Sequence, residues 1–264
     1  MWSPTEIGVL FAGGLFVGML VMLEIGRRLG SRRLADDPEK ARAGVGALEG
    51  AVFGLLGLLI AFTFSGAAAR FDDRRHLVTE EANDIGTAWL RIDLLPAEAQ
   101  PELRDLFRTY LDSRLKTYAV LPDRRAAEAE LARSVELQGK IWTKAVAAVR
   151  GAPPGPSGTA LLTSLNSMFD IVTTRTVATR IHPPSVIFVM LALLALISAL
   201  FAGNAMAEAR TRSWMHLLGY SMVLALTVYV ILDLEHPRLG LIQVKDADRV
   251  LIDLRQSLGP IGGR

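Results

Sequence analysis

Four long apolar stretches are the feature of this sequence that most limits its fold. They cover residues 7–26, 45–69, 185–207 and 214–232. About 20 mainly apolar helical residues cross a hydrocarbon core of roughly 30 Å, and each stretch reaches that length. The third contains no charged residue and follows Pro183 and Pro184, which are tolerated at a helix start. The sequence therefore predicts four transmembrane helices.

The composition agrees with a membrane protein and excludes several other functions. Hydrophobic residues make up 51% of the 264 residues, and the mean hydropathy is +0.32, which is high for a soluble protein. The 29 basic and 27 acidic residues leave a net charge of +2, far from the basic excess that nucleic-acid binding requires. The absence of cysteine excludes disulfides, thiolate metal sites and cysteine nucleophiles.

The charge distribution predicts four segments. The first (1–69) and third (183–234) are membrane hairpins, each closed by a short connection at 27–44 or 208–213. Between them lies a polar domain, 70–182, with 16 basic and 15 acidic residues, and a tail follows at 235–264. The predicted fold class is all-α, with four transmembrane helices in two hairpins and an inserted helical-bundle domain.

Apolar residues recur at helical spacing in the polar domain, as amphipathic helices require. Two stripes are the clearest, and a weaker third and a fourth follow the same rule: Phe71, Val78, Ala82, Ile85, Trp89 and Ile92; Leu131, Val135, Gln138, Trp142, Ala145 and Val149; Leu103, Phe107, Tyr110, Arg114 and Tyr118; Leu165, Phe169, Val172 and Thr176. The segment GAPPGPSG at 151–158 predicts a loop. No break follows Ala69, so the second membrane helix is expected to continue into this domain, and residues 159–182 are expected to continue into the third.

The second membrane helix contains two stripes with different side chains. The small stripe steps by three or four residues, the spacing of close helix contacts, and helix packing alone accounts for it: Gly46, Gly50, Gly54, Gly57, Ala61, Ser65 and Ala68. The bulky stripe, Leu56, Ile60 and Phe64, is a candidate for a hydrophobic constriction around an oligomer axis. Glu49 is a candidate intramembrane charge, whereas Glu24 and Asp233 lie near helix ends and are interpreted as reaching the headgroups.

The sequence shows no carrier for enzymatic chemistry. The four histidines, His76, His182, His216 and His236, lie in four different regions, and none has the spacing of a zinc site. The glycines at 44–50 are not spaced as in a dinucleotide fingerprint, and no strand precedes them. No enzyme activity, metal or cofactor is therefore predicted.

Two segments carry a resemblance to a known family. Residues 58–75, LLIAFTFSGAAARFDDRR, resemble the stretch of bacterial bestrophins in which a helix enters the neck of a pentameric anion channel, and 233–240, DLEHPRLG, resemble the segment after the last membrane helix. Together with the four-helix layout they resemble the bacterial family described as bestrophin-like, over nearly the whole chain. Arg74 and Arg75 replace the expected tryptophans, Arg238 replaces an aromatic residue, and the acidic run of the calcium clasp is missing.

The resemblance implies a function, and a rival class stays open. It implies an oligomeric channel for small anions in a bacterial inner membrane, with the neck residues falling on Leu56, Ile60 and Phe64. The expected partners are the lipid bilayer, further copies of the chain and anions. The rival is a sensor or scaffold whose helical domain binds a partner and changes its packing.

Charge and resemblance disagree on the orientation of the polar domain. An even number of spans puts both termini and the domain on one side and the two connections on the other. The connections carry eight basic residues, which favours their cytoplasmic location on the positive-inside rule: Arg27, Arg28, Arg32, Arg33, Lys40, Arg42, Arg210 and Arg212. Eight more lie near the membrane ends on the other side, so the first helix decides in favour of an exported domain. Bestrophins, as the resemblance implies, keep this domain in the cytoplasm.

A reporter fused after Gly155 tests the orientation. Alkaline phosphatase activity is expected, because the basic connection after the first helix is predicted to remain in the cytoplasm. Fluorescence from a reporter that folds only in the cytoplasm would reverse the assignment.

Overall fold

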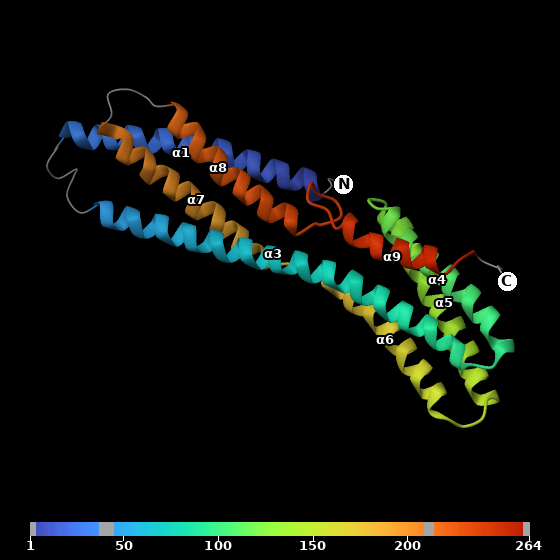
Figure 1. Ribbon diagram of the computed structural model, residues 1–264. Coiled ribbons are helices and arrows are strands. Elements are labelled where there is room, and N and C mark those ends of the chain that lie inside the picture. The colour runs from blue at the N-terminus through green and yellow to red at the C-terminus, as the bar shows by residue number, and fades with distance from the viewer. Residues whose placement is uncertain (1–3, 37–44, 209–213, 261–264) are drawn as a thin grey trace. The chain divides into compact units, whose positions relative to one another are not determined.

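The predicted fold class is confirmed by a computed structural model, which describes residues 4–36, 45–208 and 214–260. Within these residues the chain forms eight α-helices, three short 3-10 helices and no strand (Figure 1). Four helices are long and apolar enough to cross a membrane: α1 (Pro4–Asp36), α3 (Val45–Arg91), α7 (Ser185–Ala205) and α8 (Trp214–Leu234). Lys40, Arg42, Arg210 and Arg212, used in the orientation argument, lie outside the described residues.

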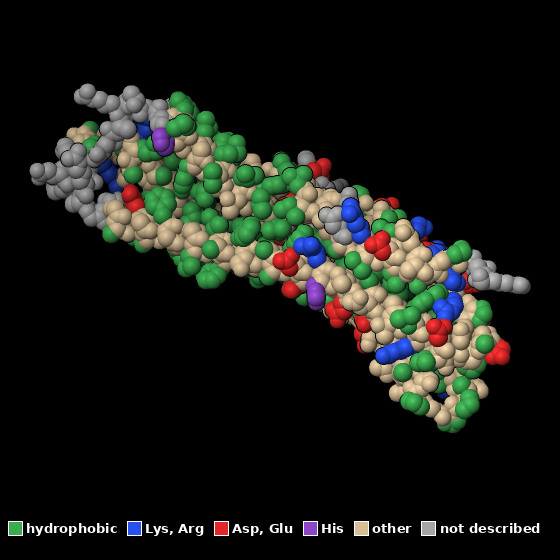
Figure 2. Space-filling model, viewed as in Figure 1, with side chains coloured by type: hydrophobic (Ala, Val, Ile, Leu, Met, Phe, Trp, Pro, Cys, Tyr) green, Lys and Arg blue, Asp and Glu red, His purple; other side chains and the backbone are tan. Residues whose placement is uncertain are grey.

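The chain divides into two compact units. The membrane unit comprises residues 1–71 and 182–241, and the polar unit comprises residues 72–181 and 242–264. On the face that Figure 2 shows, hydrophobic side chains gather over the spanning helices, and acidic and basic side chains are more frequent over the polar unit. The four predicted segments stay a prediction, because units within one chain do not show which segments fold by themselves.

The membrane unit is built around the close approach of α1 and α7. A Cβ atom at Gly26 of α1 would overlap with the carbonyl group of Leu200, and one at Gly203 of α7 would overlap with that of Leu23. Glycine at both positions therefore lets the two backbones meet directly, as small residues do in membrane helix pairs. Helix α8 packs on α1 beside this pair.

The core of the membrane unit lies among the four spanning helices. Met19 and Leu23 of α1, Ala199 of α7 and Val228 of α8 are almost completely buried there. Helix α3 contributes less to this core. In the most apolar 18 residues of each helix, the buried share is 11% for α3, 28% for α1 and α7, and 39% for α8. Most of the membrane surface of α3 is therefore uncovered within the subunit.

Two expectations on helix ends have different outcomes. The second membrane helix does continue into the polar unit, because α3 runs without a break to Arg91. The expected continuity between residues 159–182 and the third span is wrong, since α6 (Pro156–Ala178) ends seven residues before α7 begins. Pro183 and Pro184 supply no backbone N–H and disfavour helical backbone in the residue before them, which explains the break.

The polar unit is a bundle of the second half of α3 with α4 (Gln100–Ala119), α5 (Arg124–Gly151), α6 and the C-terminal α9 (Lys245–Ser257). Its core contains a buried ion cluster. The Arg114 guanidinium donates from Nε to Oε1 of Glu81 at 2.6 Å, and Arg175 pairs with Oε2 of the same carboxylate. All three side chains are at most 5% exposed. Nearby, burial raises the pKa of Tyr110, so its hydroxyl stays protonated well above neutral pH.

The glycines of α7 and α3 are expected to respond differently to substitution. Gly203→Leu forces a side chain into the backbone of α1 and should lower the free energy of unfolding by about 3 kcal/mol, the upper end of the usual cost of overpacking. A Cβ atom at Gly54 of α3 meets no atom within 4 Å, so Gly54→Leu should leave the subunit folded. Thermal unfolding in detergent measures both. Equal losses of stability would contradict this division.

Candidate functional site on helix α3

The small stripe of α3 faces outward from its own subunit. A Cβ atom at Gly46, Gly50, Gly54 or Gly57 would meet no atom within 4 Å. Ala61 and Ser65 continue the same exposed line, and Ala68 is half-buried. Contacts with other helices of the same subunit therefore do not explain the small stripe. Its predicted role in helix packing stays a prediction.

The bulky stripe divides between the core and the surface. Leu56 is 4% exposed and belongs to the core of the membrane unit, and Ile60 packs against that core. Phe64 is 43% exposed. The structure thus does not bring the three predicted pore-lining residues onto one exposed face, and their role in a pore is untested.

Another set of bulky residues of α3 is more exposed than the predicted set. Leu55 and Leu58 are each 53% exposed, and Phe62 is 68% exposed. Their spacing of three and four residues puts them on one face of the helix. The sequence contained this signal, but periodicity alone does not tell which of several apolar faces of a membrane helix meets the core.

A polar contact holds α3 near the start of its membrane segment. Asn204 of α7 donates from Nδ2 to Oε1 of Glu49 at 3.3 Å. An acidic side chain in a membrane helix is expensive without a partner, and the amide supplies one. Glu49 was predicted from the sequence as an intramembrane charge, whereas no sequence pattern indicated Asn204 as its partner.

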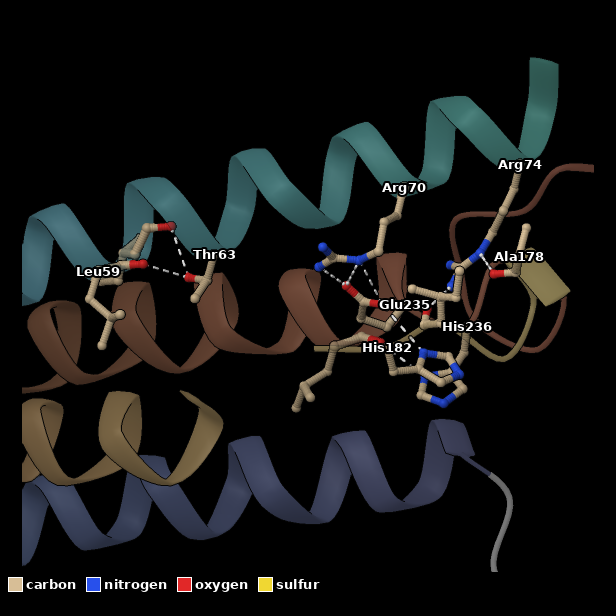
Figure 3. Close-up of polar contacts among 11 residues, drawn as sticks. Leu59, Thr63, Arg70, Arg74, Ala178, His182, Glu235 and His236 are labelled. Carbon is tan, nitrogen blue, oxygen red and sulfur yellow. Dashed lines mark hydrogen bonds and ion pairs between the residues drawn. The ribbon is translucent and has the colours of Figure 1, made fainter. Parts of the chain in front are cut away.

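A stronger polar contact holds α3 where it leaves the apolar region. Arg70 donates from Nε to Oε1 of Glu235 at 3.0 Å, and the Glu235 side chain is only 2% exposed (Figure 3). Nδ1 of His182 lies 3.4 Å from Oε2 of the same carboxylate. The ring of His182 stacks on His236 with 5.2 Å between centroids. Histidines that are 54 positions apart in the sequence thus stack on each other, and one of them lies against this carboxylate.

The turn after α8 holds Glu235 in place through Asp233. The backbone N–H of Leu241 donates to Oδ1 of Asp233 at 3.0 Å, and the hydroxyl of Tyr229 lies 3.3 Å from the same oxygen. A Cβ atom at Gly240 would overlap with this carboxylate, which explains the glycine. Asp233 is 5% exposed, so its interpretation as a side chain that reaches the headgroups is wrong.

Arg74 has a separate role in the polar unit. It donates from Nε to the carbonyl of Ala178 at 3.1 Å and from Nη2 to that of Ile181 at 2.9 Å (Figure 3). These carbonyls lie at or just after the end of α6, where backbone acceptors have no partner within the helix. Arg74 is therefore a helix-capping residue, a role that its departure from the family pattern did not predict.

Within the described residues, no group of three or more histidine, aspartate or glutamate side chains is arranged to hold a metal ion. The site is instead an exposed apolar helix face with a polar anchor at each end.

Most of the chain is similar to one known family, both in sequence and in fold. Residues 12–248 match the family described by its bestrophin-like domain. Two structures of bestrophin homolog variants from Klebsiella pneumoniae share the fold. One has 14% identity and a TM-score of 0.59, covering 91% of this chain and 98% of that chain; the other has 12% and 0.60, covering 94% and 99%. No curated protein matches with significance.

The Arg70–Glu235 contact predicts a specific pattern of stabilities. Arg70→Ala leaves a buried carboxylate without its guanidinium partner, so we expect a loss of up to about 3 kcal/mol in the free energy of unfolding. Arg70→Met combined with Glu235→Gln should cost less than Arg70→Ala, because no unpaired charge remains. Thermal unfolding measures both variants.

Glu24→Gln is the matched control for these variants. Glu24 pairs with Arg28 at 2.8 Å within one helix, and the two side chains are 30% and 73% exposed. Its removal should cost about 0.5 kcal/mol or less. If Arg70→Ala is as stable as Glu24→Gln, the anchor does not stabilise the membrane unit.

Proposed function

The chain belongs to the bestrophin-like family, and from that premise we propose that it forms an oligomeric anion channel in a bacterial inner membrane. Bestrophins are anion channels, and the shared fold supports the same use of the second membrane helix. The observation that carries the proposal is the uncovered membrane face of α3. A helix with this little burial in its own subunit gains contacts when several copies surround an axis.

The proposal gives the two exposed faces of α3 different tasks. The small stripe, from Gly46 to Ser65, packs against a neighbouring copy, because glycine and alanine let helices approach closely. The bulky face of Leu55, Leu58 and Phe62 is directed to the axis, whereas Phe64, two positions after Phe62, lies on a nearly opposite face of the helix. Rings of such side chains narrow a pore and gate it by dewetting.

Leu56 and Ile60 have a supporting role in this proposal. Leu56 belongs to the subunit core, and a residue of the axis must present its side chain outside its own subunit. The polar anchors at Glu49 and Arg70 fix the rotation of α3 about its own axis. They thereby determine which side chains reach the pore. No enzymatic step belongs to the proposal.

Anion flux into liposomes tests the function. Purified protein should carry chloride above the rate of protein-free liposomes, and Phe62→Ala should raise the flux per oligomer, because a wider apolar collar resists wetting less. Leu56→Ala is the control: it should lower the free energy of unfolding by about 2–5 kcal/mol and leave the flux per oligomer unchanged.

Two results would count against the proposal. Flux no higher than in protein-free liposomes under several anion gradients would favour the sensor or scaffold class instead. A monomer in light-scattering measurements in mild detergent would remove the pore altogether, since one subunit cannot surround an axis.

A further inference from the structure

A groove lies on the membrane unit between α1 and α8. Its volume is about 450 Å³, within the range of pockets that hold a small molecule. Val17 and Val21 contribute to its apolar wall from α1, and Leu217 does so from α8. Both valines are at least half exposed, so the groove opens to the surroundings of the helix pair.

The charges of the groove gather at one end. Glu24, Arg27 and Arg28 line it there, in the turns of α1 that follow the apolar wall. Arg28 is neutralised by Glu24 at 2.8 Å. For Arg27, the described part of the chain supplies no acidic partner, so this end carries a net charge of +1.

The position of the groove along α1 matches a boundary of the membrane. The apolar wall belongs to the apolar stretch of α1 at residues 7–26, and Arg27 follows directly after that stretch. Trp214, at the first residue of α8, lines the groove and is 56% exposed. Tryptophan is enriched at the level of lipid headgroups, and basic pockets between membrane helices bind acidic headgroups.

We propose that this groove binds one phospholipid with an anionic headgroup. An acyl chain lies along the apolar wall of Val17, Val21 and Leu217, and the phosphate group accepts hydrogen bonds from Arg27. A ligand with only an apolar chain would leave Arg27 without an acceptor, and a free phosphate would leave the wall uncovered. An anionic phospholipid satisfies both parts of the groove.

A second copy of the chain fits this groove less well than a lipid. The large uncovered helix face of the membrane unit belongs to α3, whereas the groove is formed by α1 and α8. An apolar helix placed in the groove would also bury Arg27 without a counter-charge, which is costly. The lipid site therefore does not depend on the channel proposal or on the oligomer that it requires.

Native mass spectrometry of the full chain in a neutral detergent tests the site, with phosphatidylglycerol and phosphatidylcholine as the probes. We expect phosphatidylglycerol to bind more tightly than phosphatidylcholine. Arg27→Gln should weaken the binding of phosphatidylglycerol about fivefold, since one arginine near anionic lipid contributes about 1 kcal/mol. The affinity for phosphatidylcholine should not change.

Two controls separate the site from general charge and bulk effects. Arg33→Gln makes the same charge change at an exposed position that does not line the groove, and it should leave lipid binding unchanged. Val21→Trp fills the groove and should abolish tight binding, whereas Leu10→Trp, at an exposed position outside the groove, should not.

Four outcomes would overturn the proposal. Three are equal affinity for the two lipids, equal effects of Arg27→Gln and Arg33→Gln, and unchanged binding in Val21→Trp. Free glycerol phosphate in excess should not displace the lipid, and displacement by it would show that the groove binds phosphate alone.

Discussion

The ion pair between Arg70 and Glu235 is the contact on which the arrangement of the membrane helices most depends. Helix α3 has little apolar burial within its subunit, so dispersion and hydrophobic contacts do little to fix its position. A charge pair with a carboxylate that is 2% exposed has a defined geometry, and removing either partner is costly. Together with the Glu49–Asn204 contact it fixes α3 at both ends of its membrane segment. The two contacts thereby determine which face of α3 is exposed between them.

The membrane unit uses two kinds of helix contact for two purposes. Gly26 and Gly203 allow α1 and α7 to meet at backbone distance, and this pair, with α8, forms the stable part of the subunit. The glycines of α3 meet nothing within the subunit. The same residue type thus marks a close contact in one helix pair and a surface without such a contact in α3, so the folding of the single chain does not explain the small stripe.

Length and hydropathy were enough to predict the all-α class and the four spans, because both depend on local composition. Periodicity was a less reliable guide to the buried face of a helix where similar side chains occur on several faces. In α5 (Arg124–Gly151) the buried apolar positions are Leu137, Ile141 and Ala145, whereas Val135 of the predicted stripe is 54% exposed. The polar contacts were not predictable, since Arg70 and Glu235, or Glu81 and Arg114, are far apart in sequence. The resemblance indicated that 58–75 and 233–240 belong together, and the structure joins them through Arg70 and Glu235.

The position of Leu56 shows why exposure must be known before a pore face is assigned. Successive residues of an α-helix are rotated by about 100°, so a shift of two positions moves an assignment to a nearly opposite face. Leu56 and Leu58 differ by such a shift: one is 4% exposed and lies in the core, and the other is 53% exposed. Both are leucines in the same apolar helix, and no local property distinguishes them. The distinction comes from the distant anchors, which set the rotation of α3, so a change at Arg70 or Glu49 acts on the exposed face without touching it.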